Sequence, residues 1–269
     1  MRLRAVKADW IEKILPAGWG QKLGGSRAGL NKSRKKISIP KKSEELAEIF
    51  GAILGDGYLG KNELTITSAF HEKRHLEYIK QKIRKLFGIS SKTFASYTNE
   101  NVFVLDCYSS ELVKFLTADG LAIGNKIKNK AALPGWISQK DDFIFGALRG
   151  LFDTDGGIYR KQKKYSRAFI EFQTTSPAIN RDICFLLRKT KFTPSKTFTR
   201  SGFTKKKGHN VRIQKQEEVR RFFRLVGSSN PNNIVRFKHC TEKNYVPASN
   251  RLYKQIVAYK GRLPFKTRL

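Results

Sequence analysis

The sequence predicts an α+β fold built from two copies of one αββαββα unit. Two observations predict it. Helix and strand patterns occur in the same order in each half of the chain. In each copy, the first helix ends in an acidic, glycine-rich sequence, Gly55-Asp56-Gly57 in the first and Asp155-Gly156-Gly157 in the second. A duplicated unit implies pseudo-twofold symmetry, which is the symmetry that a DNA duplex offers to a symmetric binder.

The first copy begins with a helix over residues 43–55. Ser43 is a favourable N-cap, and Glu45 and Glu48 suit the positive end of a helix. Apolar residues then recur at helical spacing as far as Leu54. The elements that follow are a strand at 63–68, a basic amphipathic helix at 71–87, a strand pair within 92–108 and a short helix at 111–116.

The second copy repeats this order. Its first helix starts at Asp141, and its second helix starts at Pro177 after Ser176, since proline suits the first helical position. The remaining elements are strands at 158–160, 168–174, 196–203 and 210–214 and a closing helix at 217–225. The predicted organisation is a basic N-terminal arm (1–42), a first repeat plus linker (43–140), a second repeat (141–230) and a basic C-terminal extension (231–269).

The charge of the chain indicates a nucleic-acid partner. The 269 residues include 54 Lys and Arg against 22 Asp and Glu, a net charge of +32. Lys and Arg side chains that bind nucleic-acid phosphates release counterions, which favours binding. The second repeat has 20 basic and 8 acidic residues, the first repeat with its linker 13 and 11. We therefore expect the second repeat to bind its half-site more strongly.

Composition also excludes several classes of protein. Three widely spaced cysteines argue against a secreted disulfide scaffold. No apolar run is long enough to span a membrane, and the N-terminus lacks a signal peptide. We expect an intracellular protein, in the cytoplasm, the nucleoid or an organelle matrix, with no membrane partner. The aromatic residues of the C-terminal extension suit either docking onto the domain or stacking on bases.

The two acidic helix ends predict a metal site. Gly51 and Gly55 in one helix, and Gly146 and Gly150 in the other, allow two helices to approach closely. The carboxylates that follow would then meet at negative helix ends and repel each other. Mg²⁺ would offset both the negative charge of the helix ends and the repulsion between the carboxylates, and it prefers oxygen ligands. The alternative is that each Asp-Gly is only a turn, but equivalent positions in two repeats favour the metal site.

The two helices resemble the paired motifs of the LAGLIDADG homing endonucleases in their single-chain, two-repeat form. Residues 148–156, Leu-Arg-Gly-Leu-Phe-Asp-Thr-Asp-Gly, match the motif closely. Residues 49–57, Ile-Phe-Gly-Ala-Ile-Leu-Gly-Asp-Gly, have Leu54 where the first Asp usually stands. The resemblance covers residues 43–230. It implies motif helices at the inter-repeat interface and two curved antiparallel sheets that form a DNA-binding saddle, and it makes Asp153 a helix-end residue, not a ligand.

The resemblance also implies roles for site residues. Asp56 and Asp155 would be catalytic and bind the metal, with the carbonyl of Gly55 or Thr154 joining the coordination. Lys215 would lie near the reactive water, although a surface lysine that starts a helix is the alternative. Mg²⁺ is the expected cofactor, Mn²⁺ is expected to substitute, and Ca²⁺ is expected to bind without supporting cutting.

Strand alternation selects residues that face DNA. Val211 and Ile213 share one face, so Arg212 and Gln214 share the other. Arg212 suits guanine, and Gln173 or Gln214 suits adenine, whereas lysine-rich hairpin loops suit phosphates. The candidate DNA-contacting residues are Lys61, Thr65, Thr67, Arg160, Lys161, Lys163, Lys164, Arg167, Gln173, Arg200, Lys205, Lys206, Lys207, Arg212 and Gln214.

The expected function is a monomeric, site-specific endonuclease, intron-encoded or free-standing, that cuts both strands of a long pseudo-palindromic DNA target. The alternative is a non-cleaving nucleic-acid-binding protein on the same scaffold, either an intron RNA maturase or a transcription regulator. A pure binder need not keep both motif Asp residues, so their presence favours the endonuclease. Binding of its own intron RNA stays open. An intein or a zinc nuclease is not expected, because the chain has no room for a splicing domain and its His and Cys lack ligand spacing.

Overall fold

The computed structural model describes residues 36–162, 165–200 and 207–267, apart from the side chains of 161–167 and 199–207. Residues Ile37–Leu269 form one compact unit. Most of the predicted N-terminal arm, residues 1–35, lies outside the described residues. None of the helices in the described part of the chain is long and apolar enough to cross a bilayer.

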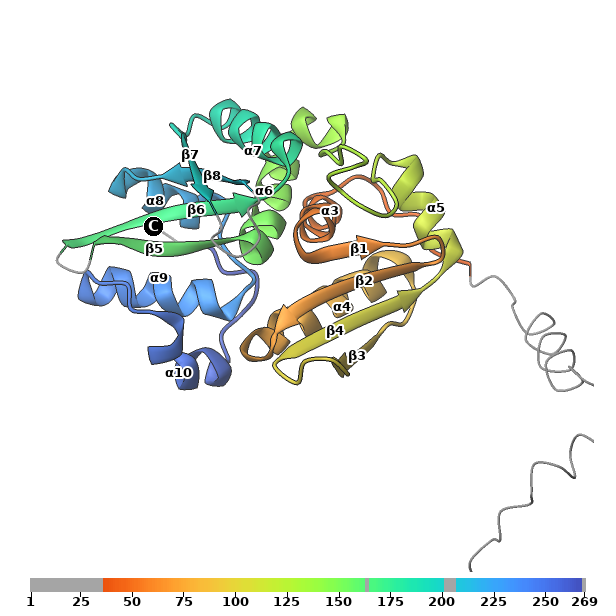
Figure 1. Ribbon diagram of the computed structural model, residues 1–269, viewed down its shortest axis with the longest axis horizontal. Helices are drawn as coiled ribbons and strands as arrows, with labels where there is room; N and C mark the ends of the chain where they lie inside the picture. Colours follow the sequence, from red (N-terminus) through yellow and green to blue (C-terminus); the bar gives the residue numbers. More distant parts are fainter. Residues whose placement is uncertain (1–35, 163–164, 201–206, 268–269) are drawn as a thin grey trace, which may run out of the picture. The chain divides into compact units, whose positions relative to one another are not determined.

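Two repeats with the same element order make up most of this unit, which confirms the predicted duplicated α+β fold (Figure 1). The first repeat consists of α3 (Glu44–Asp56), β1 (Gly57–Leu59), β2 (Glu63–Ala69), the 3₁₀ turn η1 (Phe70–Glu72), α4 (Lys73–Phe87), β3 (Lys92–Ala95), β4 (Val102–Tyr108) and α5 (Ser110–Ala118). The second consists of α6 (Asp141–Asp155), β5 (Gly156–Gln162), β6 (Tyr165–Thr174), α7 (Pro177–Lys189), β7 (Ser195–Arg200), β8 (Lys207–Ile213) and α8 (Gln216–Leu225).

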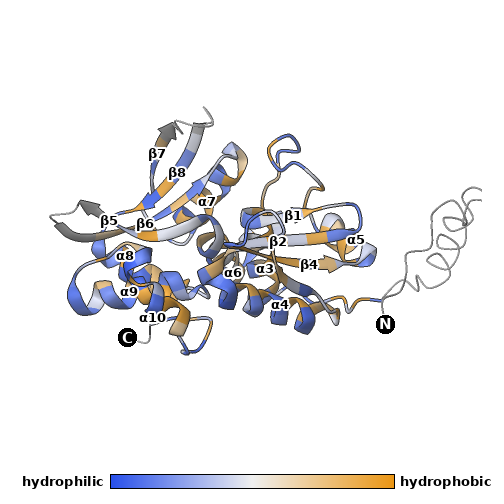
Figure 2. Cartoon of the chain, turned by 60° about the horizontal axis from the view of Figure 1, so that its bottom comes forward, coloured by the Kyte–Doolittle hydropathy of each residue, from blue (hydrophilic) through white to orange (hydrophobic). Residues whose placement is uncertain are grey.

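Each sheet has four antiparallel strands in equivalent order, β1-β2-β4-β3 and β5-β6-β8-β7. Side chains alternate between the two faces, as the period of a strand requires. In β2, Leu64 and Ile66 are buried, whereas Thr65 and Thr67 lie on the opposite face. The apolar stripe of α4 packs on the buried face, and its hydrophilic residues point outward (Figure 2).

The motif helices α3 and α6 pack side by side between the two sheets (Figure 1). Their contact depends on glycine. A Cβ atom on Gly51 would overlap the carbonyl oxygen of Ala147, and one on Gly150 would overlap that of Glu48. The predicted close approach of the two helices is therefore confirmed.

A buried ionic network crosses the same interface, and the sequence did not predict it. Arg149 of α6 is only 1% exposed. Its guanidinium donates to Glu48 at 2.8 Å and to Glu44 at 2.7 Å, both on α3. Lys82 of α4 also donates to Glu48, at 2.6 Å, and so does the hydroxyl of Ser229, at 2.7 Å. Burial alone would raise the pKa of Glu48, but Arg149 and Lys82 hold it at about 2.

The C-terminal extension is folded onto the repeats. Of the two roles that its aromatic residues suited, docking onto the domain and stacking on bases, the structure shows docking. It forms α9 (Pro231–Lys243), the 3₁₀ turn η3 (Ser249–Arg251) and α10 (Tyr253–Ala258). The ring of Phe237 stacks on Phe223 of α8 at 3.8 Å. The side-chain amide of Asn230 donates to Glu72 of the first repeat at 3.0 Å. The aromatic and polar side chains of this segment therefore dock onto the domain and connect the two repeats.

Two elements differ from the prediction. The helix predicted from residue 71 begins at Lys73, because the preceding residues form η1, where the N–H of Phe70 donates to the carbonyl of Asn101 at 2.8 Å. The linker at 125–140 contains a second 3₁₀ turn, η2 (Gly135–Gln139), which buries Trp136 against α3 and α6.

Candidate metal and nucleic-acid site

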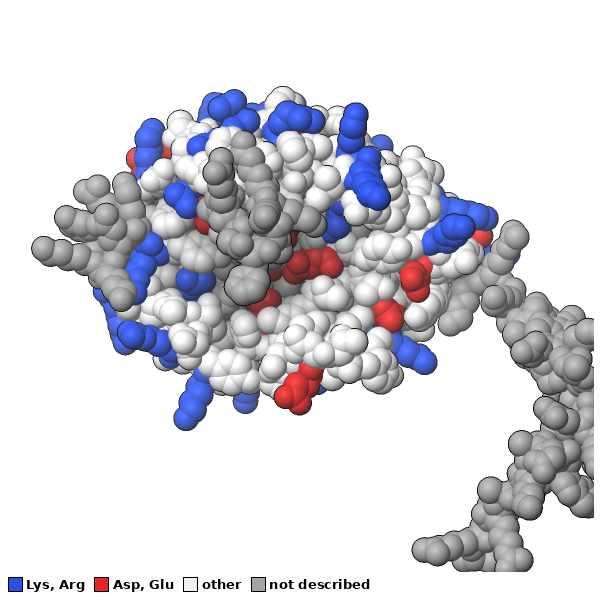
Figure 3. Space-filling view, viewed as in Figure 1, with Lys and Arg blue, Asp and Glu red and all other residues white. Residues whose placement is uncertain are grey.

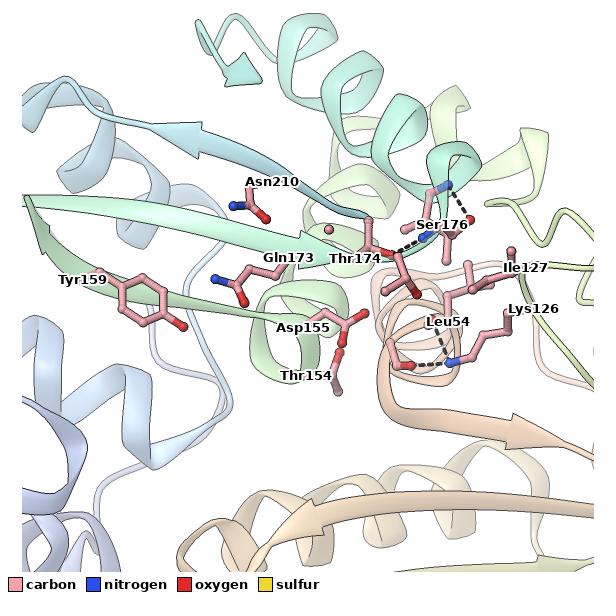
Figure 4. Close-up of a pocket in the computed structure, with 15 residues that line it drawn as sticks. Leu54, Lys126, Ile127, Thr154, Asp155, Tyr159, Gln173, Thr174, Ser176 and Asn210 are labelled. Carbon is pink, nitrogen blue, oxygen red and sulfur yellow. Dashed lines mark hydrogen bonds between the residues drawn. The ribbon is translucent and has the colours of Figure 1, made fainter. Parts of the chain in front are cut away.

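Asp56 and Asp155 meet where α3 and α6 end. The helices are so close there that a Cβ atom on Gly55 would lie 3.6 Å from Cγ of Asp155. Asp155 lines a pocket of about 460 Å³ between these helix ends and the start of the second sheet. Tyr159, Gln173 and Asn210 form its far wall (Figure 4).

The position of these carboxylates is electrostatically unfavourable. Neither α3 nor α6 has a basic residue in its last turn, so the negative helix ends are not neutralised from within. Burial, together with Asp155 and Glu72, raises the pKa of Asp56 to about 7. Burial raises the pKa of Asp155 to about 6, although Lys126 opposes it. Both groups therefore gain from a nearby cation.

Lys126, from the linker, provides a cation at this point. Its ammonium donates to the last carbonyls of α3: Leu54 at 2.9 Å, Ile53 at 3.3 Å, and Gly55 (Figure 4). Burial lowers the pKa of Lys126, and the two site carboxylates oppose that shift. Its place in the site was not predicted from the sequence, because no local pattern distinguishes it from Lys128.

The donor set at the helix ends suits a hard divalent cation. The described groups are carboxylate and carbonyl oxygens, the ligands that Mg²⁺ and Mn²⁺ accept. The described residues contain no cluster of three or more His, Cys, Asp or Glu side chains with metal-binding geometry, so phosphate and water oxygens would have to complete the coordination. The carbonyl of Gly55 accepts the Lys126 ammonium, and the hydroxyl of Thr154 donates to Gly150 within α6.

Asp153 has a different environment from Asp155, two residues further along the chain. It is 3% exposed and accepts from the N–H of Ser229, from the Ser228 hydroxyl, and from Asn233 at 3.3 Å. Burial raises its pKa to about 7, although these donors oppose the shift. Its side chain is enclosed by residues 228–233, where the second repeat joins the C-terminal extension, so it is placed as a helix-end residue and not toward the pocket.

The surface around the site has opposite charges in two zones. Acidic atoms gather in a hollow near the middle of one face, and Lys and Arg side chains lie mostly toward its periphery (Figure 3). A polyanion approaching this face would meet cations at its edge and carboxylates at its centre (Figure 3).

Residues 142–227 match the family of LAGLIDADG-like domains. The second repeat is therefore a LAGLIDADG-like domain. The match covers the second repeat, and the first repeat has the same strand order and packs its motif helix against the second. The matched region contains most of α6, and α3 is its counterpart in the first repeat by element order and packing.

Comparison with curated proteins finds partial relatives. The chain is 22% identical over 218 residues to an uncharacterised protein of Methanocaldococcus jannaschii, and 30% identical over 125 residues to the tRNA-splicing ligase RtcB of Pyrococcus abyssi. These matches cover 77% and 42% of this chain but 24% and 14% of the relatives. The chain thus spans about a quarter or less of their length, so the activities of those whole proteins are not assigned to it.

Comparison with solved structures supports the fold. Full-length DUF199/WhiA from Thermatoga maritima superposes with a TM-score of 0.50 and 15% identity, over 82% of this chain and 68% of that chain. The homing endonuclease I-DmoI in complex with DNA and Mn gives 0.46 and 15%, over 68% of this chain and 97% of that chain. The WhiA likeness shows a shared LAGLIDADG architecture.

The predicted base-reading residues of the second sheet lie on its open face and are held by neighbouring polar side chains. Arg212 forms an ion pair with Glu171, and its guanidinium lies over the ring of Phe169 at 5.1 Å. The side chain of Gln173 donates to the other oxygen of Glu171 at 2.7 Å. Gln214 is exposed and donates to Ser195 at 2.9 Å. Glu171 and Ser195 therefore hold these side chains in place.

Other predicted residues are more scattered. Arg160 donates to the hydroxyl of Tyr245 in the C-terminal extension at 2.8 Å. Lys61 is exposed beside the first sheet, and Thr65 donates to Asp106 at 2.8 Å. Thr67 is exposed on the open face of the same sheet. The side chains of Lys161, Lys163, Lys164, Arg167, Arg200, Lys205, Lys206 and Lys207 lie outside the described residues.

Lys215 does not line the pocket. Its side chain is 69% exposed and lies 3.7 Å from Glu218, one turn into α8, where Lys215 is the N-cap residue. This is the arrangement expected of a surface lysine that starts a helix.

Sequence reasoning also missed Asn210. This residue of β8 is 1% exposed and lines the pocket, and within the described structure neither its amide nitrogen nor its oxygen has a hydrogen-bond partner. Strand alternation could have found it, because it shares the open face with Arg212.

Proposed function

We propose that this protein is a site-specific endonuclease that hydrolyses both strands of double-stranded DNA with a divalent metal. The observation that carries the proposal is the meeting of Asp56 and Asp155 at equivalent ends of two packed motif helices. Each repeat contributes one carboxylate, so a single chain supplies both halves of the site, as a monomer requires. Two symmetric carboxylates suit two scissile phosphates related by the DNA dyad.

In this proposal Asp56 and Asp155 hold the metal, with the carbonyl of Gly55 or Thr154 as a further ligand. Bound Mg²⁺ supplies Lewis-acid stabilisation of the phosphate and lowers the pKa of a coordinated water. Asp56 and Asp155 would hold the ion at the ends of the two motif helices. Mn²⁺ would be expected to replace Mg²⁺, and Ca²⁺ to bind without supporting cutting. Lys215 remains a candidate for the solvent network.

The sheets hold the duplex. Arg212, Gln173 and Gln214 are proposed to read bases from the open face of the second sheet. Lys61, Thr65 and Thr67 are the proposed counterparts in the first. The basic hairpin and strand residues of the second repeat contact phosphates, which fix register without reading sequence.

The decisive experiment exposes the full-length protein to a library of long DNA targets with Mg²⁺ or with Ca²⁺. Discrete double-strand cuts are expected only with Mg²⁺, and the variants Asp56→Asn and Asp155→Asn should lose cutting while retaining binding. Asp141→Asn, at the exposed opposite end of α6, is the matched control and should cut normally. Lys215→Met tests whether Lys215 contributes to cutting.

A non-cleaving nucleic-acid-binding protein is the second candidate. The contact of Lys126 with the end of α3 favours it, because an ammonium already binds the Gly55 carbonyl that a nuclease would reserve for metal. Tight binding of DNA, or of an intron RNA, without any cutting under Mg²⁺ would support this function and reject the first.

A further inference from the structure

The loop that carries Lys126 has a fixed backbone. The N–H of Gly124 donates to the carbonyl of Leu59 at the end of β1, at 2.7 Å. The side chain of Asn125 accepts from the N–H groups of Ile127 and Lys128 at 3.0 and 2.9 Å. The N–H of Ala131 closes the turn on the carbonyl of Lys126 at 2.8 Å. The loop is therefore built to aim one side chain at the helix ends.

The ammonium of Lys126 occupies the electrostatic position that a metal ion would take. It contacts three successive carbonyls at the negative end of α3. One of them belongs to Gly55, whose oxygen the proposed function assigns to the metal. Lys126 also lines the same pocket as Asp155 (Figure 4). Lys128, two residues on, is exposed and makes no such contact in the described structure.

We propose that Lys126 is a built-in cation that holds the Asp56–Asp155 site in the free protein and must be displaced when a divalent metal binds. The inference rests on the metal site of the proposed function. An ammonium and a metal ion repel each other at this range and compete for the same carbonyl oxygen. Lys126 therefore weakens metal binding until DNA phosphates add their own negative charge, which restricts a loaded site to the DNA complex.

Direct metal titration tests the competition. Free protein is titrated with Mn²⁺ at one mildly alkaline pH, and unbound Mn²⁺ is measured by electron paramagnetic resonance. Lys126→Met, which keeps an aliphatic stem but no charge, should bind Mn²⁺ at least about tenfold more tightly than wild type, since removal of a repelling charge is worth that much or more. Lys126→Arg should stay weak, and Lys128→Met should match wild type. Equal affinity in wild type and Lys126→Met would overturn the inference.

Amine labelling of the unmodified protein provides a test that does not depend on how the variants fold. Without metal, Lys126 should be acetylated more slowly than Lys128, as mass spectrometry of the digest would report. Saturating Mn²⁺ should raise the Lys126 rate toward that of Lys128. Protection of Lys126 that persists while Mn²⁺ is bound would overturn the inference.

These outcomes separate the two proposals. If Mn²⁺ binds and releases Lys126 but no DNA is cut, the nuclease proposal fails and this inference stands. If DNA is cut and Lys126→Met binds metal no better than wild type, only this inference fails. If neither free wild type nor free Lys126→Met binds Mn²⁺, this inference fails, and the cutting assay alone decides the nuclease proposal.

Discussion

The two repeats share a backbone plan but differ in what surrounds the end of each motif helix. At the end of α3, Leu54 is buried among apolar residues and the linker brings Lys126 to the helix carbonyls. At the equivalent position of α6, Asp153 is buried among donors from residues 229–233, where the second repeat joins the C-terminal extension. Duplication therefore places the two site carboxylates, and the linker and this junction determine the groups around the end of each helix.

The open faces of the two sheets differ as well. The first presents Tyr58 and Tyr108, which are 50% and 66% exposed, and pairs Thr65 with Asp106. The second presents Arg212 in contact with Glu171. The open face of the first repeat thus presents aromatic residues, whereas that of the second presents an arginine paired with a glutamate. The second repeat as a whole has the larger excess of basic residues.

The largest effect is expected from Glu48→Gln, which tests whether the buried network joins the repeats. The change leaves Arg149 and Lys82 buried without their shared carboxylate, and breaking such a buried pair costs about 3–5 kcal/mol. Glu45→Gln on the same helix breaks only the exposed pair with Lys85 and should cost less than about 1 kcal/mol. Urea unfolding measures both, and similar small losses would show that the network does not join the repeats.

The lowered pKa of Glu48 also predicts how the stability of the protein changes at acidic pH. Because the pKa of Glu48 is lowered from 4.5 to about 2, its contribution is present above pH 4.5 and is lost as pH falls toward 2. Wild type should lose stability over that interval, and Glu48→Gln should lose less. Unfolding free energies measured across this range test the sign, and parallel curves for the two proteins would contradict it.

Glycine substitutions test what the repeats have in common. Gly51→Ala and Gly150→Ala each place a methyl group against a carbonyl oxygen of the facing helix. Overpacking of this kind costs about 1–3 kcal/mol, occasionally more, and the two losses should be similar. Gly135→Ala, where a Cβ atom meets nothing within 4 Å, is the control. A loss confined to one helix would show that the interface is not symmetric.

Asp153→Leu tests what the repeats do not share, since it gives α6 the residue that α3 has at this position. The N–H of Ser229 would lose its acceptor, and the amide of Asn233 would keep only the carbonyl of Phe152, at 3.4 Å. A buried unpaired donor costs about 1–3 kcal/mol. Asp142→Asn, an exposed residue in the first turn of α6, should cost about 0.3–1 kcal/mol. Thermal unfolding compares them, and equal losses would remove the special role of the C-terminal extension.

The smallest effect per residue is expected in the salt dependence of DNA binding. Replacing Lys161, Lys163 and Lys164 by Ala should reduce the slope of log affinity against log salt by about 0.9 for each phosphate that the protein no longer neutralises. Lys61→Ala in the first repeat should reduce the slope by no more than about 0.9, the value for a single phosphate. Filter-binding titrations at several salt concentrations measure the slopes, and equal changes from the two sets would contradict the proposed asymmetry.

Local patterns explain why much of the fold could be predicted. Ser43 and Ser176 cap the helices that they were expected to cap, because the capping hydrogen bond joins residues only three positions apart. Glycine spacing in α3 and α6 indicated the helix pair, since close packing requires small residues wherever the partner lies. The boundary of α4 was displaced because a hydrogen bond from Phe70 to the distant Asn101 favours a 3₁₀ turn.

The sequence by itself determined the duplicated αββαββα fold, the pair of motif helices and the acidic residue at the end of each. Those features follow from periodicity and from residue types that act over one or two turns. Only the tertiary structure decided that Lys126 reaches Gly55, that Arg149 meets Glu48 and that Ser229 donates to Asp153. These contacts join residues separated by 71 to 101 positions. No local pattern encodes them, because the sequence around each partner is equally compatible with an ordinary exposed residue.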